Sequence, residues 1–510
     1  MKKISRRSFI KTTASAAAVT IATPLLPRGL YSLARADTPG YFENEFGITD
    51  SLFQKVLAKA LSKGGDFADL FFEHTISNRI LMEDGKVNRA YSNVSLGVGI
   101  RTVKGDQVGY GFTQELAENP MLNAASTAAT IASGEGKQPH GKFEPLKLKN
   151  YYPLKTLLTS VPLKSKLPLI EHTNDKCFAL SPLIVKVNAG FYDQQKRILV
   201  VTSDGVKAED LQPRNYLYAT VVAEKNGKRE RGRWNLGGRK DFSFYTQSVA
   251  EEIAKTAVDR ALVLFDAVKP PAGEMPVVLG PGVTGVLLHE AIGHGMEADF
   301  NRKKISTYAT MLGKKVAESF VTIVDDGTIP QLLGSINTDD EGTPGQRTVL
   351  VDKGILSSYM YDKISAQHYK VKSTGNGRRQ SYQHFVQPRM RNTIMLAGQD
   401  TPEDVIKSVD KGIYVQDVSN GEVRIGAGDF AFYVSQGRVI ENGKLGAPIK
   451  DINIMGNGPK MLKNTSMLAN NLEMSKGGGG ACGKGGQAVP CGFGQPTCLV
   501  KSMTVGGVRK

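Results

Sequence analysis

Apolar residues recur at helical spacing between residues 50 and 63, which predicts an amphipathic helix. The residues that mark its apolar face are Leu52, Val56, Leu57 and Leu61. Asp50, at the start of this stretch, is typical of a helix cap. Three stretches rich in strand-forming residues follow, at 68–74, 79–83 and 94–102. Residues 120–133 return to the helical pattern, so we predict an α+β module over residues 37–140.

A looser version of the same plan covers residues 150–268. Helical patterns occupy residues 154–179 and 248–265. Strand-like stretches lie between them, near residues 184–191, 196–203 and 216–224. The chain therefore predicts helix, strands and helix twice, without a sequence repeat that would indicate a duplication.

A Pro-Pro-containing linker at residues 268–273 separates these modules from the rest of the chain. A short apolar strand at 275–279 and a glycine-rich turn at 280–285 then lead into a predicted helix, and strands and turns predominate from residue 320 onwards. The predicted fold class is α+β. Two N-terminal helix/antiparallel-sheet modules are followed by a β-rich C-terminal domain over residues 274–510.

Length and charge narrow the class of protein. A chain of 510 residues suggests about three domains, and 40% apolar residues suffice for separate cores. The formal charge of +16 falls to +9 when the first 36 residues, with seven basic side chains and no acid, are set aside. Later basic runs, such as residues 224–233, include acids and lack the interleaved aromatic residues of a nucleic-acid platform. We expect no nucleic-acid partner.

Residues 1–36 resemble a twin-arginine signal peptide. Arg6 and Arg7 are followed by a modestly apolar run over residues 12–26 and by a small-x-small cleavage site at residues 34–36. The run is too short to span a bilayer well. We expect a mature protein that is periplasmic, or otherwise exported by the twin-arginine pathway, and that has no membrane span. The alternative is a cytoplasmic basic arm.

The sequence His-Glu-Ala-Ile-Gly-His at residues 289–294 carries the strongest chemical signal. Imidazoles are suited to zinc, and a neighbouring carboxylate such as Glu290 can act as a base towards a metal-activated water. His289 and His294 are five residues apart, so a regular helix would separate their side chains by roughly 140°. An extra residue in the turn, as in a π-bulge, would bring them together, and Gly293 is suited to such an irregularity. The alternative is an amphipathic helix with two hydrogen-bonded histidines.

A third ligand has to come from elsewhere. Cys482 lies in a glycine-rich stretch, residues 477–486, and a thiolate is a strong zinc ligand. Glycines let the backbone pass close to a metal or a substrate. Glu297, three residues after His294, is the alternative ligand, or it orients the histidine from behind. A surface loop with an incidental cysteine is the simpler explanation for residues 477–486.

Several separate motifs, in the order of the family, resemble the TldD/PmbA metallopeptidases. The stretches that carry the resemblance are residues 289–299, 324–330, 339–344, 374–379, 388–390, 428–430 and 482–484. The resemblance implies a Zn²⁺ site of His289, His294 and Cys482, with Glu290 as the catalytic base. It also implies a TldD-type active subunit, because TldE-type subunits lack the two histidines and glutamate.

The resemblance further implies a dimer that encloses a cavity and admits unstructured peptides in extended form. The partner would be a second copy or a TldE-like chain. Arg378, Arg379 and Tyr382 are the predicted substrate-binding residues, and structural pairing is the alternative for them. Cys491 and Phe493 stand where small aliphatic residues are expected, and Arg391 where Thr is expected. Substrate preference therefore does not carry over from the family.

The predicted function is an exported zinc-dependent peptidase that hydrolyses peptide bonds in unfolded or extended peptides. One alternative is a non-catalytic peptide-binding partner subunit of a TldD/TldE-like complex. Another is an oxidoreductase, because residues 280–285 fit the Gly-x-Gly-x-x-Gly nucleotide fingerprint between a strand and a helix. If Cys482 binds metal, three cysteines remain, and Cys491 and Cys498 are close enough in sequence for a disulfide.

Overall fold

A computed structural model of the protein describes residues 40–507. The predicted signal peptide at residues 1–36 lies outside the described residues. Within them, the order of the elements follows the predicted sequence of two mixed modules and a β-rich C-terminal region. No helix in this part of the chain combines the length and apolar character needed to cross a membrane.

The first module begins with two helices, α2 (Tyr41–Phe46) and α3 (Asp50–Ala60). Thr49, rather than Asp50, caps α3, because its side chain accepts a hydrogen bond from the amide of Leu52. Three strands and a helix follow: β1 (Phe67–Glu83), β2 (Lys86–Lys104), β3 (Gln107–Thr113) and α4 (Glu118–Ala129). The two predicted strands at 68–74 and 79–83 form the single strand β1.

The second module also combines helices with long strands. Its elements are β4 (Glu144–Pro145), α5 (Leu163–Leu180), β5 (Ile184–Thr202), β6 (Val206–Lys225), β7 (Lys228–Gly238) and α6 (Gln247–Leu262). Short 3₁₀ turns lie at Leu158–Ser160, Phe242–Phe244 and Val263–Asp266. The predicted strands at 184–191 and 196–203 are again one strand, β5, because polar residues between them do not interrupt the ladder.

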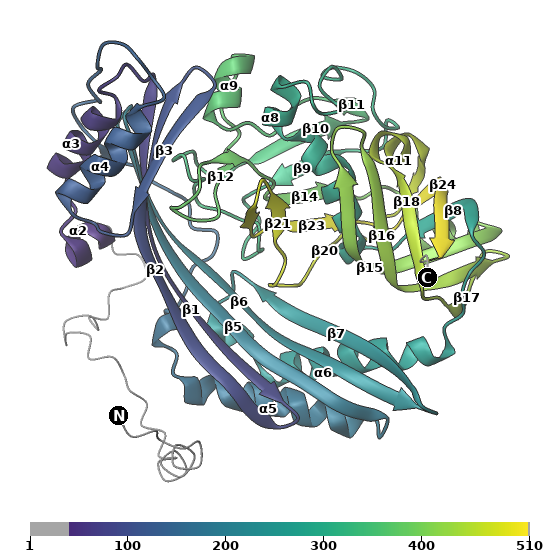
Figure 1. Ribbon diagram of the computed structural model, residues 1–510. Coiled ribbons are helices and arrows are strands. Elements are labelled where there is room, and N and C mark those ends of the chain that lie inside the picture. Colours follow the sequence, from purple (N-terminus) through teal and green to yellow (C-terminus); the bar gives the residue numbers. More distant parts are fainter. Residues whose placement is uncertain (1–39, 508–510) are drawn as a thin grey trace, which may run out of the picture.

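The two N-terminal modules share one sheet, which the sequence did not indicate. Strand β1 pairs antiparallel with β5 from Asp69–Thr202 to Glu83–Asn188, and the sheet order is β3-β2-β1-β5-β6, with β7 and β4 both on β6. Residues at alternate positions of a strand face opposite sides. Leu70 and Ile80 pack with the helices, whereas Phe71 packs on the other side against Tyr382 of the C-terminal region. In Figure 1 the long strands curve around the C-terminal region, with the helices outside.

The C-terminal domain contains two larger sheets. The order of the first is β15-β8-β24-β18-β16-β17, and β19 also pairs with β24. Its strands are β8 (Gly273–Leu279), β15 (Lys411–Arg424), β16 (Asp429–Glu441), β17 (Lys444–Pro448), β18 (Ile452–Asn457), β19 (Thr465–Leu468) and β24 (Cys498–Gly507). Strand β8 pairs parallel with β15 and antiparallel with β24.

The second sheet has the order β11-β10-β9-β14-β23-β20. Its strands are β9 (Ile323–Asp326), β10 (Arg347–Asp352), β11 (Ile355–Leu356), β14 (Asn392–Met395), β20 (Glu473–Met474) and β23 (Gly492–Gln495). Two hairpins complete the strands: β12 (Gly377–Arg378) with β13 (Gln387–Pro388), and β21 (Cys482–Lys484) with β22 (Gln487–Val489). The short helices are α8 (Ala298–Arg302), α9 (Lys363–Tyr369), α10 (Pro402–Lys407) and α11 (Gly458–Asn464).

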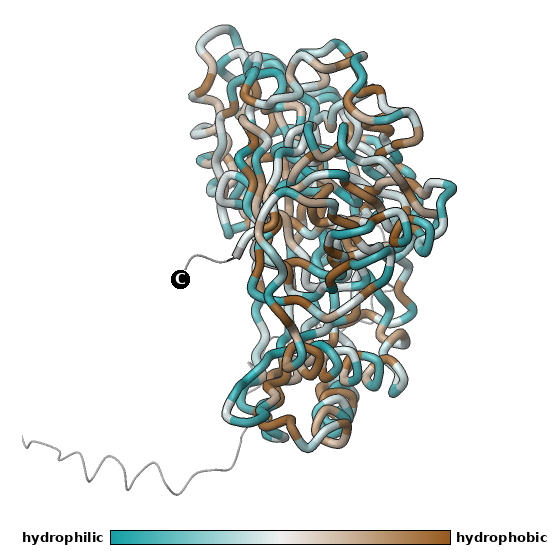
Figure 2. Tube along the Cα trace, turned by 90° about the vertical axis from the view of Figure 1, so that its right-hand side faces the viewer, coloured by the Kyte–Doolittle hydropathy of each residue, from teal (hydrophilic) through white to brown (hydrophobic). Residues whose placement is uncertain are grey.

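Buried ion pairs fix the curved sheet to the C-terminal domain. Arg101 of β2 donates to Asp69 of β1, Nε–Oδ2 2.6 Å, and to Glu341 of the C-terminal domain, Nη2–Oε1 2.7 Å. All three side chains are fully buried. Hydrophobic and hydrophilic stretches are interspersed along the whole described chain (Figure 2), as expected for elements that bury one face. Three separate hydrophobic clusters lie under α3 and α4, under α5 and α6, and within the C-terminal domain.

Candidate metal centre

His289 begins a π-helical turn and His294 directly follows it, the irregularity that their spacing predicts. Strand β8 leads through a 3₁₀ turn at Gly282–Thr284 into α7 (Gly285–Leu288), and the π turn occupies His289–Gly293. A 3₁₀ turn, His294–Met296, follows directly. The wider π turn takes up the fifth residue between the histidines, so their ring centroids come within 5.2 Å of each other at an interplanar angle of 85°.

Packing explains why a glycine is needed in this turn. A Cβ atom at Gly293 would lie 2.1 Å from the sulfur of Met390, which is fully buried. Leu287 and Leu288 are also fully buried and belong to the C-terminal core. The turn therefore packs directly against Met390 and the C-terminal core, and a side chain at residue 293 would require Met390 to move.

Cys482 completes a cluster of three ligand-type atoms. It begins β21, and its thiol lies 3.3 Å from Nε2 of His294. The metal-binding atoms of His289, His294 and Cys482 all lie within 4.8 Å of one another, and the three residues are buried. Of the two predicted third ligands, the structure thus brings Cys482 to the histidines.

Glu297 lies behind His294 instead. Its carboxylate accepts from Nδ1 of His294 at 2.9 Å, so the imidazole presents Nε2 to Cys482. Glu297 is fully buried, and Lys484 Nζ lies 3.2 Å and Arg389 Nε 3.9 Å from its carboxylate. A carboxylate on the outer nitrogen fixes the tautomer and orientation of a metal-binding histidine. Neither Lys484 nor Arg389 was predicted to take part.

The electrostatics of the cluster favour a thiolate. A hydrogen bond from Cys491 is the largest effect on the pKa of Cys482 and lowers it well below its usual range, helped by His289 and His294 and opposed by burial. Burial lowers the pKa of His294, but Glu297 and Cys482 together outweigh burial and raise that pKa above its usual value. These interactions favour a thiolate–imidazolium pair, and a metal held by His294 and Cys482 would take the place of the shared proton.

The donor set fits a zinc ion. Two imidazoles and a thiolate with a fourth position open are typical of catalytic zinc sites. Nδ1 of His289 is buried and has no hydrogen-bond partner among the described residues, which leaves it without compensation for its burial. Glu290 is the least buried member of the group: its side chain is 23% exposed, and Oε2 lies 3.6 Å from Nε2 of His294. It lies beside the cluster and towards the solvent.

The glycine turn at residues 280–285 serves packing. A Cβ atom at Gly285 would lie 3.0 Å from the backbone nitrogen of Gly494 in β23, so the start of α7 rests directly on that strand. The side chain of Thr284 donates back to the carbonyl of Gly280 and accepts from Gln495. These contacts account for the turn by packing and hydrogen bonding, without a bound nucleotide.

The predicted substrate-binding residues lie at the boundary between the sheet and the C-terminal domain. Arg378 donates to the carbonyls of Met390, at 2.6 Å, and Pro490, at 2.7 Å. Arg379 forms an ion pair with Asp69 at 3.0 Å. Tyr382 is 1% exposed and packs under β2, where a Cβ atom at Gly97 would touch its ring. Arg378 and Arg379 line a cavity, whereas the Tyr382 ring is enclosed.

The disulfide that the spacing of Cys491 and Cys498 allows does not form in the structure. All four cysteines are free and buried. Cys498 lies in β24 beside Gln495, whereas Cys491 turns towards Cys482. The hydrogen bond to the Cys482 thiolate, together with burial, raises the pKa of Cys491 well above its usual value. Cys491 thus stays a neutral thiol next to the metal cluster, a role that its position in the sequence did not reveal.

Comparison with known proteins places the chain in the class of metallopeptidases. Three consecutive parts of the chain match models of the PmbA/TldA metallopeptidases: domain 1 at residues 68–132, the central domain at 157–265 and the C-terminal domain at 272–507. The chain is 40% identical over 454 residues to the metalloprotease TldD homolog of Haemophilus influenzae, covering 87% of this chain and 93% of that protein. The chain belongs to the PmbA/TldD family of metallopeptidases.

The chain is also similar to proteins of lower sequence identity. A zinc metalloprotease TldD homolog of Saccharolobus solfataricus is 26% identical over 469 residues, covering 89% of this chain and 99% of that protein. The crystal structure of a putative modulator of a DNA gyrase from Thermotoga maritima superposes with a TM-score of 0.73 at 20% identity, covering 89% and 99% of the two chains. TldE from Thermococcus kodakarensis superposes with a TM-score of 0.69 at 18% identity, covering 87% and 97%. These two similarities concern the fold alone.

Proposed function

We propose that the protein is an exported zinc-dependent peptidase that hydrolyses peptide bonds in unfolded or extended peptides. The observation that carries the proposal is the buried cluster of His289, His294 and Cys482 with Glu290 beside it on the solvent side. The name of the relative from Saccharolobus solfataricus, a zinc metalloprotease, supports zinc as the metal.

A zinc ion held by these three side chains supplies Lewis-acid chemistry: it activates water and polarises a carbonyl group. Glu290 accepts the proton of the attacking water and later donates it to the leaving amine. Its partial exposure leaves it within reach of a substrate, whereas the ligands themselves are buried. Glu297 holds His294 with Nε2 directed to the cluster, and Cys491 stabilises the thiolate of Cys482.

Strand addition at the β21–β22 hairpin would hold an extended peptide. This hairpin has only two strands among residues 40–507, and its first strand begins with Cys482. A Cβ atom at Gly483 would meet nothing within 4 Å, so the backbone there is open to an approaching strand. Backbone hydrogen bonds bind a peptide with little dependence on its sequence.

The proposal extends to partners and location. We propose a dimer, either of two copies or with a TldE-like chain, and the similarity of the fold to TldE supports a partner of that type. The twin-arginine sequence at residues 5–11 supports export to the periplasm or an equivalent compartment.

The substitution Glu290→Gln tests the chemistry. It keeps shape and hydrogen bonding but removes the basic carboxylate, so hydrolysis of an unstructured peptide should fall at least ~10²-fold. Zinc content and the thermal unfolding midpoint should stay at wild-type values. Glu318→Gln, which neutralises an exposed carboxylate far along the chain, is the matched control. Wild-type hydrolysis by Glu290→Gln would rule out Glu290 as the base.

The alternative, a non-catalytic peptide-binding subunit, differs in what it requires. Such a subunit needs neither zinc nor Glu290, so peptide would bind equally well with the metal removed, and mass spectrometry would show no cleavage products. The clustering of all four residues favours the enzyme.

A further inference from the structure

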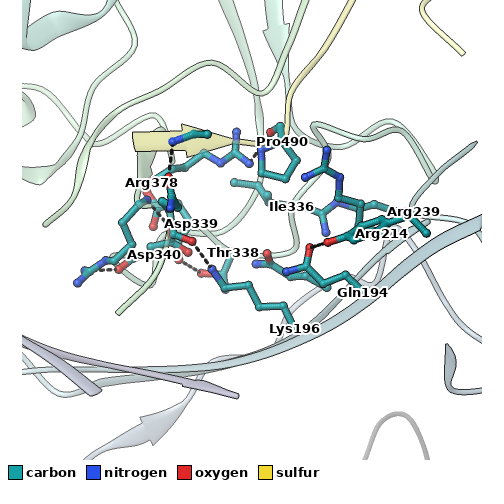
Figure 3. A pocket seen from close by; sticks show the side chains of 15 residues that line it. Gln194, Lys196, Arg214, Arg239, Ile336, Thr338, Asp339, Asp340, Arg378 and Pro490 are labelled. Atoms are coloured by element: carbon teal, nitrogen blue, oxygen red, sulfur yellow. Dashed lines mark hydrogen bonds between the residues drawn. The ribbon is translucent and has the colours of Figure 1, made fainter. Parts of the chain in front are cut away.

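A polar cavity of about 210 Å³ lies between the concave face of the large sheet and the C-terminal domain. Strands β5 and β6 contribute Tyr192, Lys196 and Arg214 to it, and the loop after β7 contributes Arg239. Figure 3 shows Arg214 and Arg239 on the sheet side and Arg378 on the opposite side, with Asp339 and Asp340 next to Arg378.

The cavity holds more positive than negative charge. Its basic residues are Lys196, Arg214, Arg239, Arg378 and Arg379, and its acidic residues are Asp339 and Asp340. Arg379 and Lys196 are neutralised from outside the cavity by Asp69, at 3.0 Å, and Glu73, at 3.3 Å. Asp339 accepts hydrogen bonds from three backbone amides, and burial and the nearby Glu341 raise its pKa to about 8, which reduces its negative charge at neutral pH.

Among residues 40–507, the other three guanidinium groups form no ion pair within 4 Å, although Asp340 attracts Arg378 and Asp210 attracts Arg239 from farther away. Arg214 donates to the carbonyls of Gly478 and Gly480, and Arg378 donates to those of Met390 and Pro490. Burial lowers the pKa of Arg378 to about 10; the nearby Asp340 opposes this effect, and repulsion from Arg239 adds to it. A buried guanidinium without an ion pair is stabilised when an anion binds to it.

Arg239 has the least satisfied side chain of the three. It is 2% exposed and forms no ion pair within 4 Å among residues 40–507, although its charge opposes the effect of burial on the pKa of the buried Asp210. Its Nη1 donates to the carbonyl of Pro213 at 3.3 Å, and its guanidinium stacks over Tyr152 at 4.7 Å. Nε and Nη2 have no hydrogen-bond partner among the described residues. Together these two atoms form the edge of a guanidinium that binds a carboxylate with two parallel hydrogen bonds.

We propose that this cavity binds a carboxylate group of the peptide substrate, with Arg239 as its main contact and Arg214 and Arg378 beside it. The inference rests on the proposed peptidase function. Pro490, which lines the cavity and accepts from Arg378, directly precedes Cys491, whose thiol hydrogen-bonds to Cys482. The carboxylate is that of the peptide C-terminus or of an acidic side chain, and the two sources are separated by experiment.

The test measures binding rather than turnover. A fluorescent extended peptide with one Glu and a free C-terminus is titrated, by fluorescence anisotropy, into zinc-loaded Glu290→Gln protein. Two further peptides carry either a C-terminal amide or Gln in place of Glu. One of these two changes should raise Kd about tenfold or more, because a hydrogen-bonded charge is lost. Amide sensitivity identifies the C-terminus, and Glu sensitivity identifies the side chain.

Variants connect this preference to the cavity. Arg239→Gln, added to Glu290→Gln, should bind the free-carboxylate and neutral peptides with equal Kd. Arg214→Gln, a less buried change, should reduce the preference and keeps the test valid if Arg239→Gln fails to fold. Arg229→Gln removes the same charge from β7, where the side chain is 71% exposed, and should leave the preference intact.

Two results overturn the inference: no dependence on either carboxylate in the parent, or a dependence that survives in both Arg239→Gln and Arg214→Gln. Both results are independent of the proposed function. A protein that cleaves peptides without any carboxylate preference remains a peptidase and loses the carboxylate cavity. A protein that binds carboxylate peptides tightly but never cleaves them keeps the cavity and loses the peptidase.

Discussion

The contact between Glu297 and His294 leads to a quantitative prediction for the substitution Glu297→Gln. The wild-type carboxylate is fully buried and accepts from Nδ1 of His294 at 2.9 Å. Glutamine keeps an acceptor oxygen of nearly the same reach but removes the negative charge. Without that charge, the imidazole is a weaker donor ligand and is less firmly held in the tautomer that presents Nε2.

Loss of such a partner typically weakens metal binding 10–100-fold, or about 1.4–2.8 kcal/mol. We expect a value within this range rather than a collapse, because the cations around Glu297 are not left alone. Lys484 keeps its ion pair with Asp299 at 2.7 Å and its hydrogen bond to the carbonyl of Pro388. Arg389 keeps hydrogen bonds to the carbonyls of Cys482 and Gln487. The folded protein should therefore survive the change, with a lower free energy of unfolding.

Competition with a chromophoric chelator at pH 7.5 measures the Kd for zinc directly. Glu290→Gln is the matched control, since it neutralises a carboxylate on the other side of the same histidine, 3.6 Å from Nε2. We expect its Kd to stay within about threefold of wild type, or about 0.7 kcal/mol. An unchanged Kd in Glu297→Gln, with an intact fold, would refute the role given to Glu297.

Further predictions follow from single contacts. Burial, helped by Arg197, lowers the pKa of His74 in the folded protein from 6.5 to about 4. Between these pH values the unfolded chain binds a proton that the folded protein does not bind. The free energy of unfolding therefore falls as the pH drops. The loss from pH 7.5 to 5 is about 2 kcal/mol, and urea titrations should show it largely absent in His74→Gln. Gly293→Ala should force Met390 aside, destabilise the protein by about 1–3 kcal/mol and reduce zinc content, both measurable on the purified protein. Arg6-Arg7→Lys-Lys should leave precursor in the cytoplasm on fractionation, and normal export would contradict the signal assignment.

The candidate metal-binding residues could be predicted from the sequence, because their signal is local. The spacing of His289 and His294 is incompatible with a regular helix, and a π turn is one of few solutions. Other features depend on contacts between distant parts of the chain, which periodicity does not report. Cys491 has no ligand spacing of its own, and its role comes from the hairpin that returns the chain beside Cys482. Arg239 is one of many basic residues until folding places it against the cavity.

The sheet shared by the two N-terminal modules could not be predicted either, because it also depends on contacts between distant parts of the chain. The apolar alternation in β1 and β5 predicts strands but not their pairing, because the paired residues are 105 to 133 positions apart, from Glu83–Asn188 to Asp69–Thr202. Polar residues in the middle of both strands also made each appear as two. In β5, the polar residues Tyr192, Gln194 and Lys196 line the cavity between the sheet and the C-terminal domain.

The pairing of β1 with β5 has a consequence for biosynthesis. The first module cannot complete its sheet until residues up to Thr202 have left the ribosome. Strand β8 likewise cannot pair with β24 until Cys498, which lies opposite Leu279, has been synthesised. Contacts this far apart in sequence close late and slowly. Until then long strand edges are open to other chains. We expect the nascent protein to depend on chaperones that shield these edges, and Cys482 to reach the two histidines late, because it follows His294 by 188 residues.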